Sequence, residues 1–296
     1  MRVTSSSVAG NLVYNLQQVT KRIDTLQTQL ASGKQVQTVS DDPNQARSGM
    51  KLRTSLTANE QYQKNANDAE GWIQSTDMAL DQLGRVLERA KVLAVNGGMD
   101  TLPVESRQAL ADEAKQLLGE AVQVGNATYG DKYIFAGFKT KSPAFTLTGL
   151  TVTPNNPSDG SEILNREISA GVRLSINVTG QALTDTKVFD ALSNLANSLS
   201  SGQALETGTT RLQEIDDSIN AILSLRSEIG AKANRVAAAK DALTGAEVNI
   251  NKLLESAEDV DVTKAIVDLT VAETSRQTAL AVGARIIPKT LVDFLR

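Results

Sequence analysis

The stretch that decides the fold is residues 212–254, which read LQEIDDSINAILSLRSEIGAKANRVAAAKDALTGAEVNINKLL. Every seventh position of one column is apolar, and this column consists of Ile215, Ile222, Ile229, Val236, Leu243 and Ile250. The column three residues earlier is mixed and consists of Leu212, Ile219, Arg226, Ala233, Lys240, Glu247 and Leu254. An apolar repeat of seven over six heptads is typical of a helix in a coiled coil. The sequence therefore predicts one long helix, from about residue 209 to 257, that packs along a partner helix.

That partner is predicted over residues 43–95. Ser40-Asp41-Asp42-Pro43 places acidic caps and a tolerated proline at its start, and Asn96-Gly97-Gly98 ends it. If the two helices run antiparallel, with paired residue numbers that sum to about 309, Glu70 lies close to Lys240 and their ion pair fixes the register. The same register, extended to the chain ends, places Leu30 near Ala279. The apolar seam of the partner is predicted at Leu52, Leu56, Ala66, Ile73, Leu80, Leu83, Leu87 and Ala94.

The two chain ends are predicted to be helices as well, over about residues 6–31 and 262–296. Ala31-Ser32-Gly33-Lys34 is read as a helix C-cap, because it lacks the spacing of a phosphate loop. An apolar stripe at helical spacing needs a partner, so we expect these ends to contact other subunits. The expected assembly residues are Leu12, Leu16, Val19, Ile23, Leu26, Leu30, Ile266, Leu269, Leu280, Ile287, Leu291 and Phe294.

The last helix carries many small side chains, since alanines and Gly283 stand between its larger residues. Small side chains bury little area each, and Pro288 removes a backbone donor. We therefore expect the terminal pair to be weakly held in a single chain and ordered in an assembly.

The middle of the chain changes character after residue 128. Short alternating runs predict strands at 133–135, 145–147, 150–152 and 172–178, with a turn at 154–160. Shorter helices are predicted at 104–126 and from about 187, followed by a loop marked by Gly202 and Gly208.

The expected fold class is mainly α with a small β insertion, in which N- and C-terminal segments form an antiparallel coiled-coil or helical-bundle rod. We expect paired terminal helices at 1–35 and 262–296, a helical rod at 36–130 and 187–261, and a small outer β domain at 131–186. The expected rod core combines the apolar column that starts at Ile215 with Leu80, Leu83 and Leu87.

Composition narrows the range of functions. The 296 residues include 30 basic and 34 acidic side chains, a net charge of −4, which argues against nucleic acid as a partner. No apolar run approaches the roughly 18 residues of a membrane span, so no membrane contact is expected. The N-terminus has no apolar h-region, so we expect no cleaved secretory signal, although export that reads an uncleaved N-terminus stays possible.

Histidine and cysteine are both absent, which removes thiolate nucleophiles, disulfides and imidazole chemistry. Aromatic residues make up only 3%, which disfavours a large ligand pocket. Glu258-Asp259-Val260-Asp261 lacks the full ligand loop of a calcium site and is read as the cap of the last helix. We expect no enzymatic activity, no catalytic residues, no cofactor and no metal.

Several segments resemble the bacterial flagellin family. Residues 36–46, VQTVSDDPNQA, are similar to the segment that joins the terminal and rod helices of flagellins, and LASGK at 30–34 is similar to the end of their first helix. DVDV at 259–262 and PKTLVDFL at 288–295 resemble the flagellin C-terminal region. The resemblance covers roughly the first 95 and the last 90 residues. Within the family, YIFAG at 133–137, the short chain and the ending DFL at 293–295 resemble the hook–filament junction branch, hook-associated protein 3.

The resemblance implies a structural subunit of the bacterial flagellum that joins the hook to the filament. It implies terminal helices that pair around a central channel, a rod in contact with neighbouring subunits and an outward β domain. It also implies export through the flagellar type III channel to an extracellular location, without a cleaved signal. The implied partners are further copies of the chain in a ring-like assembly, flagellin, the hook-side adaptor hook-associated protein, and a cytoplasmic export chaperone at the C-terminal helix.

Three alternatives stay open at the level of sequence. The first is a filament flagellin, a protein of the same kind in another position. The second is a secreted coiled-coil adhesin that binds a ligand through residues 133–178. The third is an enzyme, which the absent histidine and cysteine make the least favoured.

Overall fold

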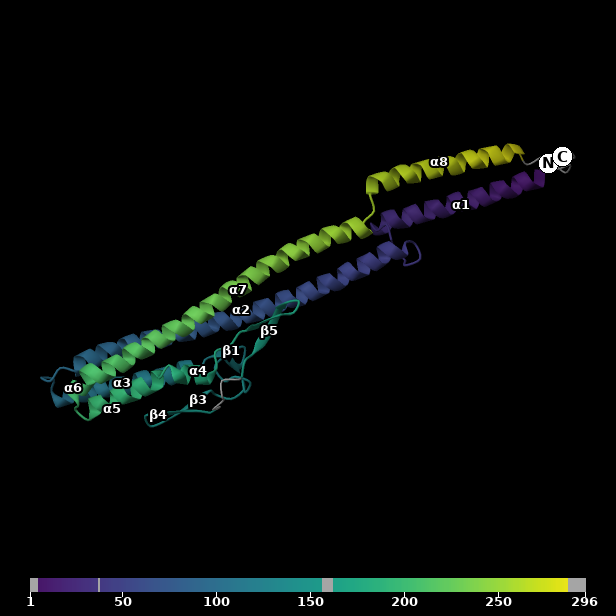
Figure 1. Cartoon of the computed structure of the whole chain (residues 1–296). Coiled ribbons are helices and arrows are strands. Elements are labelled where there is room, and N and C mark those ends of the chain that lie inside the picture. Colours follow the sequence, from purple (N-terminus) through teal and green to yellow (C-terminus); the bar gives the residue numbers. More distant parts are fainter. Residues whose placement is uncertain (1–4, 37, 156–161, 287–296) are drawn as a thin grey trace. The chain divides into compact units, whose positions relative to one another are not determined.

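The computed structural model describes residues 5–36, 38–155 and 162–286 (Figure 1). The expectations for Ile287, Pro288, Leu291 and Phe294, and for most of the turn at 154–160, lie outside these residues. The helices are α1 (Ser5–Ser32), α2 (Pro43–Gly97), α3 (Val104–Gly125), α4 (Gly180–Asp185), α5 (Val188–Ser200), α6 (Ala204–Glu206), the π-helix η1 (Thr207–Arg211), α7 (Leu212–Glu258) and α8 (Val262–Ile286). The strands are β1 (Thr128–Tyr129), β2 (Lys132–Tyr133), β3 (Phe145–Thr148), β4 (Thr151–Pro154), β5 (Asn165–Ser169) and β6 (Val172–Ser175).

Local capping chemistry explains where the long helices begin and end. Gly33 adopts a φ of +72° directly after α1, the left-handed conformation that glycine takes at low cost. Asp42 Oδ1 accepts hydrogen bonds from the backbone N–H groups of Asn44 (2.9 Å) and Gln45 (3.0 Å), so α2 begins with a satisfied first turn. Asp261 caps α8 in the same way, because its Oδ1 accepts from Lys264 N at 3.0 Å. The predicted caps at these three positions are confirmed.

The chain divides into two compact units. Unit 1 consists of residues 1–58 and 247–296, and unit 2 consists of residues 59–246. The helices α2 and α7 each contribute one end to unit 1 and the larger part to unit 2. Among the described helices, none is both long enough and apolar enough to cross a membrane.

Unit 2 contains one large hydrophobic core, to which α2, α3, α5 and α7 all contribute. The column of α7 is buried from Ile215 to Leu243, and Leu80, Leu83 and Leu87 of α2 are fully buried opposite it. Ile250, the last residue of the column, belongs to unit 1 and is half-buried.

The mixed column of α7 explains how the two long helices keep their antiparallel register. Lys240 Nζ lies 2.6 Å from Glu70 Oε2, so the predicted ion pair is present, and Arg226 Nε lies 3.0 Å from Asp77 Oδ1. These two basic residues stand among the apolar residues of the mixed column because they face acidic residues of α2. Buried Asn59 adds a second constraint, since its Nδ2 donates to the Leu243 carbonyl at 3.0 Å.

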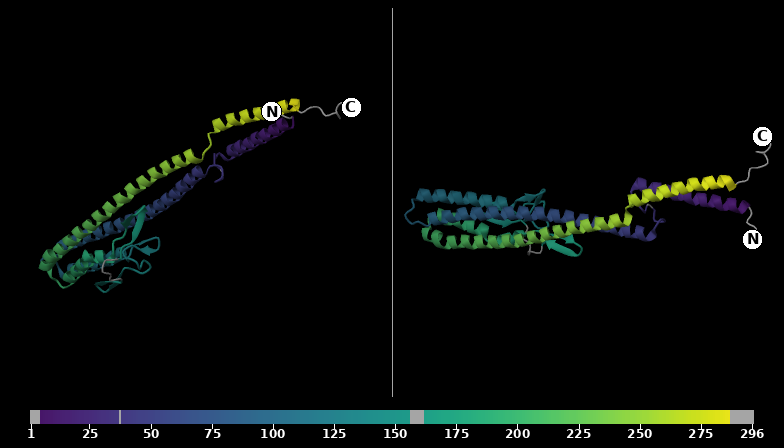
Figure 2. Two further views of the ribbon diagram at one scale, coloured as in Figure 1. Left: turned by 45° about the vertical axis from the view of Figure 1, so that its right-hand side comes forward. Right: turned by 90° about the horizontal axis from the view of Figure 1, so that it is seen from above.

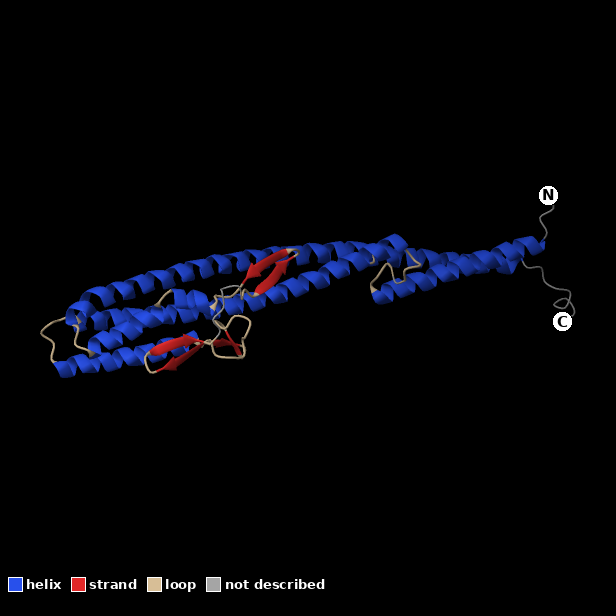
Figure 3. Ribbon diagram, turned by 60° about the horizontal axis from the view of Figure 1, so that its bottom comes forward, coloured by secondary structure: helices blue, strands red, loops and turns tan. Residues whose placement is uncertain are grey.

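The strands form three separate antiparallel hairpins, β1–β2, β3–β4 and β5–β6 (Figure 3). The predicted strand at 145–147 lies within β3, and that at 150–152 overlaps β4. The strands β1 and β5 were not predicted from the sequence. The last strand was predicted to reach residue 178, whereas β6 ends at Ser175. At 133–135 only Tyr133 belongs to a strand. Two-residue strands such as β1 carry too little alternation to be recognised.

The hairpins share the core of the helices instead of forming their own. Phe145 of β3 packs against Phe189 of α5 with ring centroids 4.7 Å apart, and the Asn126 side chain bonds to both N and O of Phe145. On the β5–β6 hairpin, Arg166 Nε donates to Asp68 Oδ2 of α2 at 2.8 Å. Aromatic packing and charge-assisted bonds thus fix the hairpins to unit 2.

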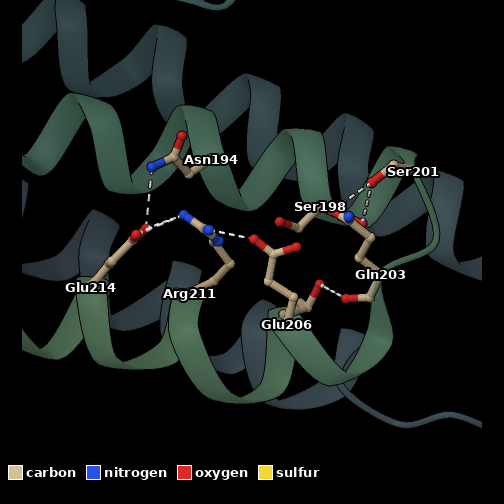
Figure 4. Close-up of polar contacts among 8 residues, drawn as sticks. Asn194, Ser198, Ser201, Gln203, Glu206, Arg211 and Glu214 are labelled. Atoms are coloured by element: carbon tan, nitrogen blue, oxygen red, sulfur yellow. Dashed lines mark hydrogen bonds and ion pairs between the residues drawn. The ribbon is translucent and has the colours of Figure 1, made fainter.

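The predicted loop at Gly208 is wrong, because Gly208 lies inside η1. A methyl group on Gly98 would lie 2.6 Å from Gly208 Cα, so glycine serves here for close backbone approach. Next to this contact, Arg211 is held between the carboxylates of Glu206 and Glu214, and Asn194 donates to Glu214 (Figure 4).

The core of unit 2 can be tested with two neighbouring residues of α7. Ile222 is 1% exposed and Leu223 is 53% exposed. Ile222→Ala is expected to lower the free energy of unfolding by about 2–5 kcal/mol, because it removes buried methylene groups and leaves a cavity. Leu223→Ala, the matched control, is expected to change it by less than about 0.5 kcal/mol. Urea unfolding monitored by the fluorescence of Trp72, the only tryptophan, measures both. Equal losses in the two variants would contradict the buried column.

Candidate assembly surface and the joint beside it

The helices α1 and α8 lie side by side as the terminal pair of unit 1 (Figure 2). Their seam buries Ile23, Leu26 and Ala272, with Val19 and Leu269 packed partly against them. Among the described residues one ion pair accompanies the seam, between Arg22 and Asp268 at 3.7 Å, and it is too exposed to stabilise much. Burial of apolar surface stabilises by roughly 25 cal/mol per Å², so the small area buried by these few side chains stabilises the pair only weakly.

Small residues of α8, not its large ones, make the contact with α1. Ala265, Ala272 and Gly283 are buried, whereas the larger Ile266 and Leu280 of the same helix are exposed. A methyl group on Gly283 would lie 2.6 Å from Leu12 Cδ2, so the helices approach closely there. Of the predicted assembly residues on α8, Leu269 packs partly against the seam, whereas Ile266 and Leu280 lie outside it, and their contact with another subunit stays a prediction.

The register predicted for the terminal pair is wrong. Residues that meet across α1 and α8, such as Arg22 with Asp268 or Leu12 with Gly283, have numbers that sum to about 290–295 and not to 309. Leu30 therefore lies far along the seam from Ala279. The physical reason is unequal connections: residues 33–42 separate α1 from α2, but only 259–261 separate α7 from α8.

Both helices of the pair, α1 and α8, expose several apolar side chains to solvent. Exposed apolar residues that gather on one part of a protein often mark a binding surface. The exposed residues are Val13, Tyr14, Val262, Ile266, Val267, Val271, Leu280 and Val282.

Two shallow grooves open on this surface. The α8 groove, of about 610 Å³, includes Val271, Val282 and threonines, with Leu12 from α1. Thr274 and Thr278 donate their hydroxyls to carbonyls of their own helix, so these polar groups need no outside partner. The α1 groove, of about 580 Å³, is lined by Val13, Leu16, Gln17, Thr20, Lys21 and Asp24.

The predicted assembly residues fall into three groups. Ile23 and Leu26 are buried in the seam, and Ile266 and Leu280 are exposed. The remaining described residues are half-buried: Leu12, Leu16, Val19, Leu30 and Leu269.

A joint of backbone hydrogen bonds ties the segment after α1 to the segment before α8. Gln35 N donates to the Glu258 carbonyl at 2.6 Å, and Val260 N donates to the Gly33 carbonyl at 2.9 Å. Lys34 and Asp259 form an isolated antiparallel bridge between them. Two strand-like bonds thus fix where the terminal pair begins.

The Glu258 carboxylate is the electrostatic centre of this joint. Arg53 of α2 donates to both of its oxygens, with Nε 2.9 Å from Oε1, and Lys34 Nζ lies 3.3 Å from Oε2. The side chain of Glu258 is only 13% exposed. The hydrogen bonds from Arg53 are the main cause that lowers the pKa of Glu258; partial burial opposes them and Lys34 adds to them. Sequence reading treated Glu258 as part of a helix cap and missed its two cationic partners, which lie far away along the chain.

Comparison with known proteins adds an independent line of information. The family model of the bacterial flagellin N-terminal helical region matches residues 3–140, and that of the bacterial flagellin C-terminal helical region matches residues 212–295. The terminal helices α1 and α8 and the whole of α2 and α7 lie within the matched ranges.

The individual proteins that are similar to this chain are flagellar proteins as well. Flagellar hook-associated protein 3 of Escherichia coli is 26% identical over 228 residues, which is 76% of this chain and 68% of the relative. A flagellin of Halalkalibacterium halodurans is 23% identical over 288 residues, 97% of this chain and 95% of the relative. The solved structure of a putative flagellar hook-associated protein from Vibrio parahaemolyticus has the same fold, with a TM-score of 0.66 and 21% identity; the match covers 74% of this chain and 100% of that one.

The joint can be tested through its pH dependence. Because the pKa of Glu258 is lowered by folding, its ion pairs stabilise unit 1 above the ordinary glutamate pKa, and this stability is lost as pH falls through the lowered folded value. Hydrogen-exchange protection of Gln35 N and Val260 N, corrected for intrinsic rates, is expected to fall across that acid range. Glu258→Gln is expected to lower this protection already at neutral pH, by about 1–3 kcal/mol.

The matched control is Glu255→Gln, an exposed glutamate one turn earlier on α7. It is expected to leave the acid transition unchanged. If Glu258→Gln showed the same acid transition in hydrogen-exchange protection as the parent chain, another group would control the joint.

Proposed function

Because the chain belongs to the bacterial flagellin family, we propose that it is a structural subunit of the bacterial flagellum that joins the hook to the filament. The single observation that carries this proposal is the exposed apolar surface of α1 and α8 beside a thinly buried seam. Such a surface is stable in water only when further subunits cover it.

The two unlike grooves of the terminal pair support an assembly in which each copy contacts the next through a different face. The α8 groove has no charged lining residue, whereas Lys21 and Asp24 line the α1 groove. Contacts between two unlike faces are heterologous, and repeated heterologous contacts produce rings or helical tubes. The proposed assembly residues are those exposed or half-buried on this pair, and the proposed channel-lining segments are 1–35 and 262–296.

The position at the junction, as opposed to the filament, rests on relatives. A hook-associated protein 3 and a flagellin both match the chain, and the flagellin match spans more of it. Filament flagellin is therefore the second candidate. The junction is proposed first because the resemblance at YIFAG, residues 133–137, and the ending at 293–295 favour it.

The proposal includes specific partners and a location. A junction subunit contacts further copies of itself in a ring, flagellin on one side and the hook-side adaptor on the other, outside the cell. It reaches that place unfolded through the flagellar export channel, without a cleaved signal, and a cytoplasmic chaperone holds α8 until then. The thin seam of the pair suits this route, because little free energy is needed to keep α8 away from α1.

The remaining parts have supporting roles in this proposal. Segments 36–130 and 187–261 form the rod, and 131–186 face outward. No catalytic role is proposed, since the matched relatives are structural flagellar proteins.

The assembly surface can be tested with one charge on α8. Val271→Asp is expected to reduce the amount of the chain that co-purifies with isolated flagella by more than about tenfold, because an unpaired charge would be buried between subunits. Gln277→Asp, at an exposed polar position of the same helix, is the matched control and is expected to incorporate normally. Normal incorporation of Val271→Asp would remove α8 from the subunit contact.

The location can be tested by immunogold electron microscopy of intact flagella with an antibody to residues 131–186. A narrow band of label where hook meets filament is the expected result. Label along the whole filament would assign the chain to flagellins, and label absent from flagella would contradict both candidates.

A further inference from the structure

The repeat of seven in α7 changes once, at the start of the helix. Ile215 and the later residues of the apolar column follow one another at steps of seven. The next buried side chain towards the N-terminus is Thr207, which is 0% exposed and lies eight residues before Ile215. The chain stays helical across this interval, since α6, η1 and α7 follow without a break from Ala204 to Glu258. Thr207 and the column are thus both buried, with one residue more between them than the repeat provides.

The extra residue coincides with η1, the π-helix at Thr207–Arg211. Backbone hydrogen bonds join residues five apart in a π-helix and four apart in an α-helix. A π turn therefore takes up one residue more than an α turn, and the position of η1 accounts for the step of eight.

The ion pair between Glu206 and Arg211 has a spacing that suits this geometry. Residues five apart in an α-helix point about 140° away from each other, because each residue turns by about 100°. In a π turn the fifth residue returns to the same side of the helix. The pair of Arg211 with Glu206 therefore suits the π turn, whereas its pair with Glu214, three residues later and 2.6 Å from Nη1 to Oε2, also fits an α-helix (Figure 4).

The side chain of Arg211 is well placed to stabilise η1. It is only 14% exposed, and it contacts one carboxylate before the π turn and one after it. Asn194 of α5 donates to Glu214 at 3.2 Å and so connects this cluster to the next helix. Charge-assisted hydrogen bonds that are shielded from water are stronger than those of an exposed pair.

The π turn presents two consecutive residues to the end of α2. A methyl group on Gly98 would lie 2.6 Å from Gly208 Cα, and one on Gly97 would lie 3.3 Å from Thr207 Cγ2. Consecutive residues of an α-helix point about 100° apart, so we expect an α-helix to bring only one of the two this close.

The loop between α2 and α3, at residues 98–103, starts at this contact. Gly98 N donates to the Ala94 carbonyl at 2.9 Å, and Met99 N donates to the Asn96 carbonyl at 3.3 Å. The amides of Gly98 and Met99 thus report on how firmly the start of the loop is held.

We propose that η1 is a one-residue insertion in the repeat of α7, that the pair of Glu206 with Arg211 keeps it in the π form, and that it holds the loop at residues 98–103 in place. Arg211 is a positioning residue in this device, since it acts on the loop through the backbone of η1. All parts of the device belong to unit 2, and it does not depend on the proposed function.

Deletion of Thr210, an exposed residue of η1, tests whether the insertion can be removed. The deletion places Thr207 seven residues before the residue now numbered Ile215, and it brings Glu206 and Arg211 to the spacing of four that suits an α-helix. The apolar column therefore stays in the core. The melting temperature of unit 2, followed by the fluorescence of Trp72, is the measurement.

The matched control is deletion of Ser224, an exposed residue within α7. This deletion turns Ile229, Val236 and Leu243 by about 100° relative to Ile222, so it is expected to lower the melting temperature by more than about 10 °C or to prevent folding. Deletion of Thr210 is expected to cause less than half of the loss that the control causes. A loss of half or more would overturn the proposal.

Glu206→Gln tests the role of the ion pair by hydrogen exchange. In the parent chain it is expected to make the amides of Gly98 and Met99 exchange about tenfold faster, because the π turn loses its charged partner. In the chain that lacks Thr210 there is no π turn to hold, so the same substitution is expected to change their exchange by less than about twofold. An ion pair that merely stabilises the helix would give the same acceleration in both chains.

Glu228→Gln is the control for loss of a carboxylate elsewhere on α7, since it removes the ion pair with Lys232. It is expected to leave the exchange of Gly98 and Met99 unchanged in both chains. Equal acceleration by Glu206→Gln in the two chains, or no acceleration in the parent chain, would overturn the proposal.

Discussion

The amount of apolar surface that each part of the chain can bury governs the behaviour of this molecule. In unit 2 the apolar column of α7 meets Leu80, Leu83 and Leu87, and the hairpins add Phe145 and further side chains to the same core. Among its described residues, the terminal pair of unit 1 buries only a small cluster around Ile23, Leu26 and Ala272. Because burial stabilises in proportion to area, we expect unit 2 to be the more stable part and the terminal pair to gain stability from the proposed neighbours.

The weak seam follows from the choice of small residues on α8. Alanine and glycine let α1 approach closely, and they leave Ile266, Val271 and Leu280 of the same helix facing outward. Large residues in the seam would have produced a stable hairpin with a polar exterior, which has nothing to offer a second subunit. In the proposed assembly this exposed apolar area serves contacts between chains, and the Glu258 joint fixes where the pair starts.

The sequence allowed the rod to be predicted in detail because its signals are strong and local. Six heptads identified α7, capping residues identified both ends of its partner, and the mixed column suggested the ion pair between Glu70 and Lys240 that the structure contains. Periodicity at 3.6 or 3.5 residues carries this information without reference to the rest of the chain.

Prediction was poorer where the decisive contact is distant or small. Alanine and Gly283 carry no hydrophobic period, so periodicity did not show which residues of α8 meet α1. Arg53 and Glu258 are separated by most of the chain, and no local pattern shows that they meet. The register of the terminal pair depends on the unequal lengths of two connections, which helical periodicity does not encode.

The central claim is that subunit contacts, not contacts within one chain, hold α1 and α8 in place. Hydrogen exchange of the free chain and of the assembled chain tests it most directly. The account predicts that amides of α1 and α8 exchange much faster than those of α2 and α7 in unit 2 when the chain is free, and become protected on assembly. Equal protection of all four helices in the free chain would contradict it.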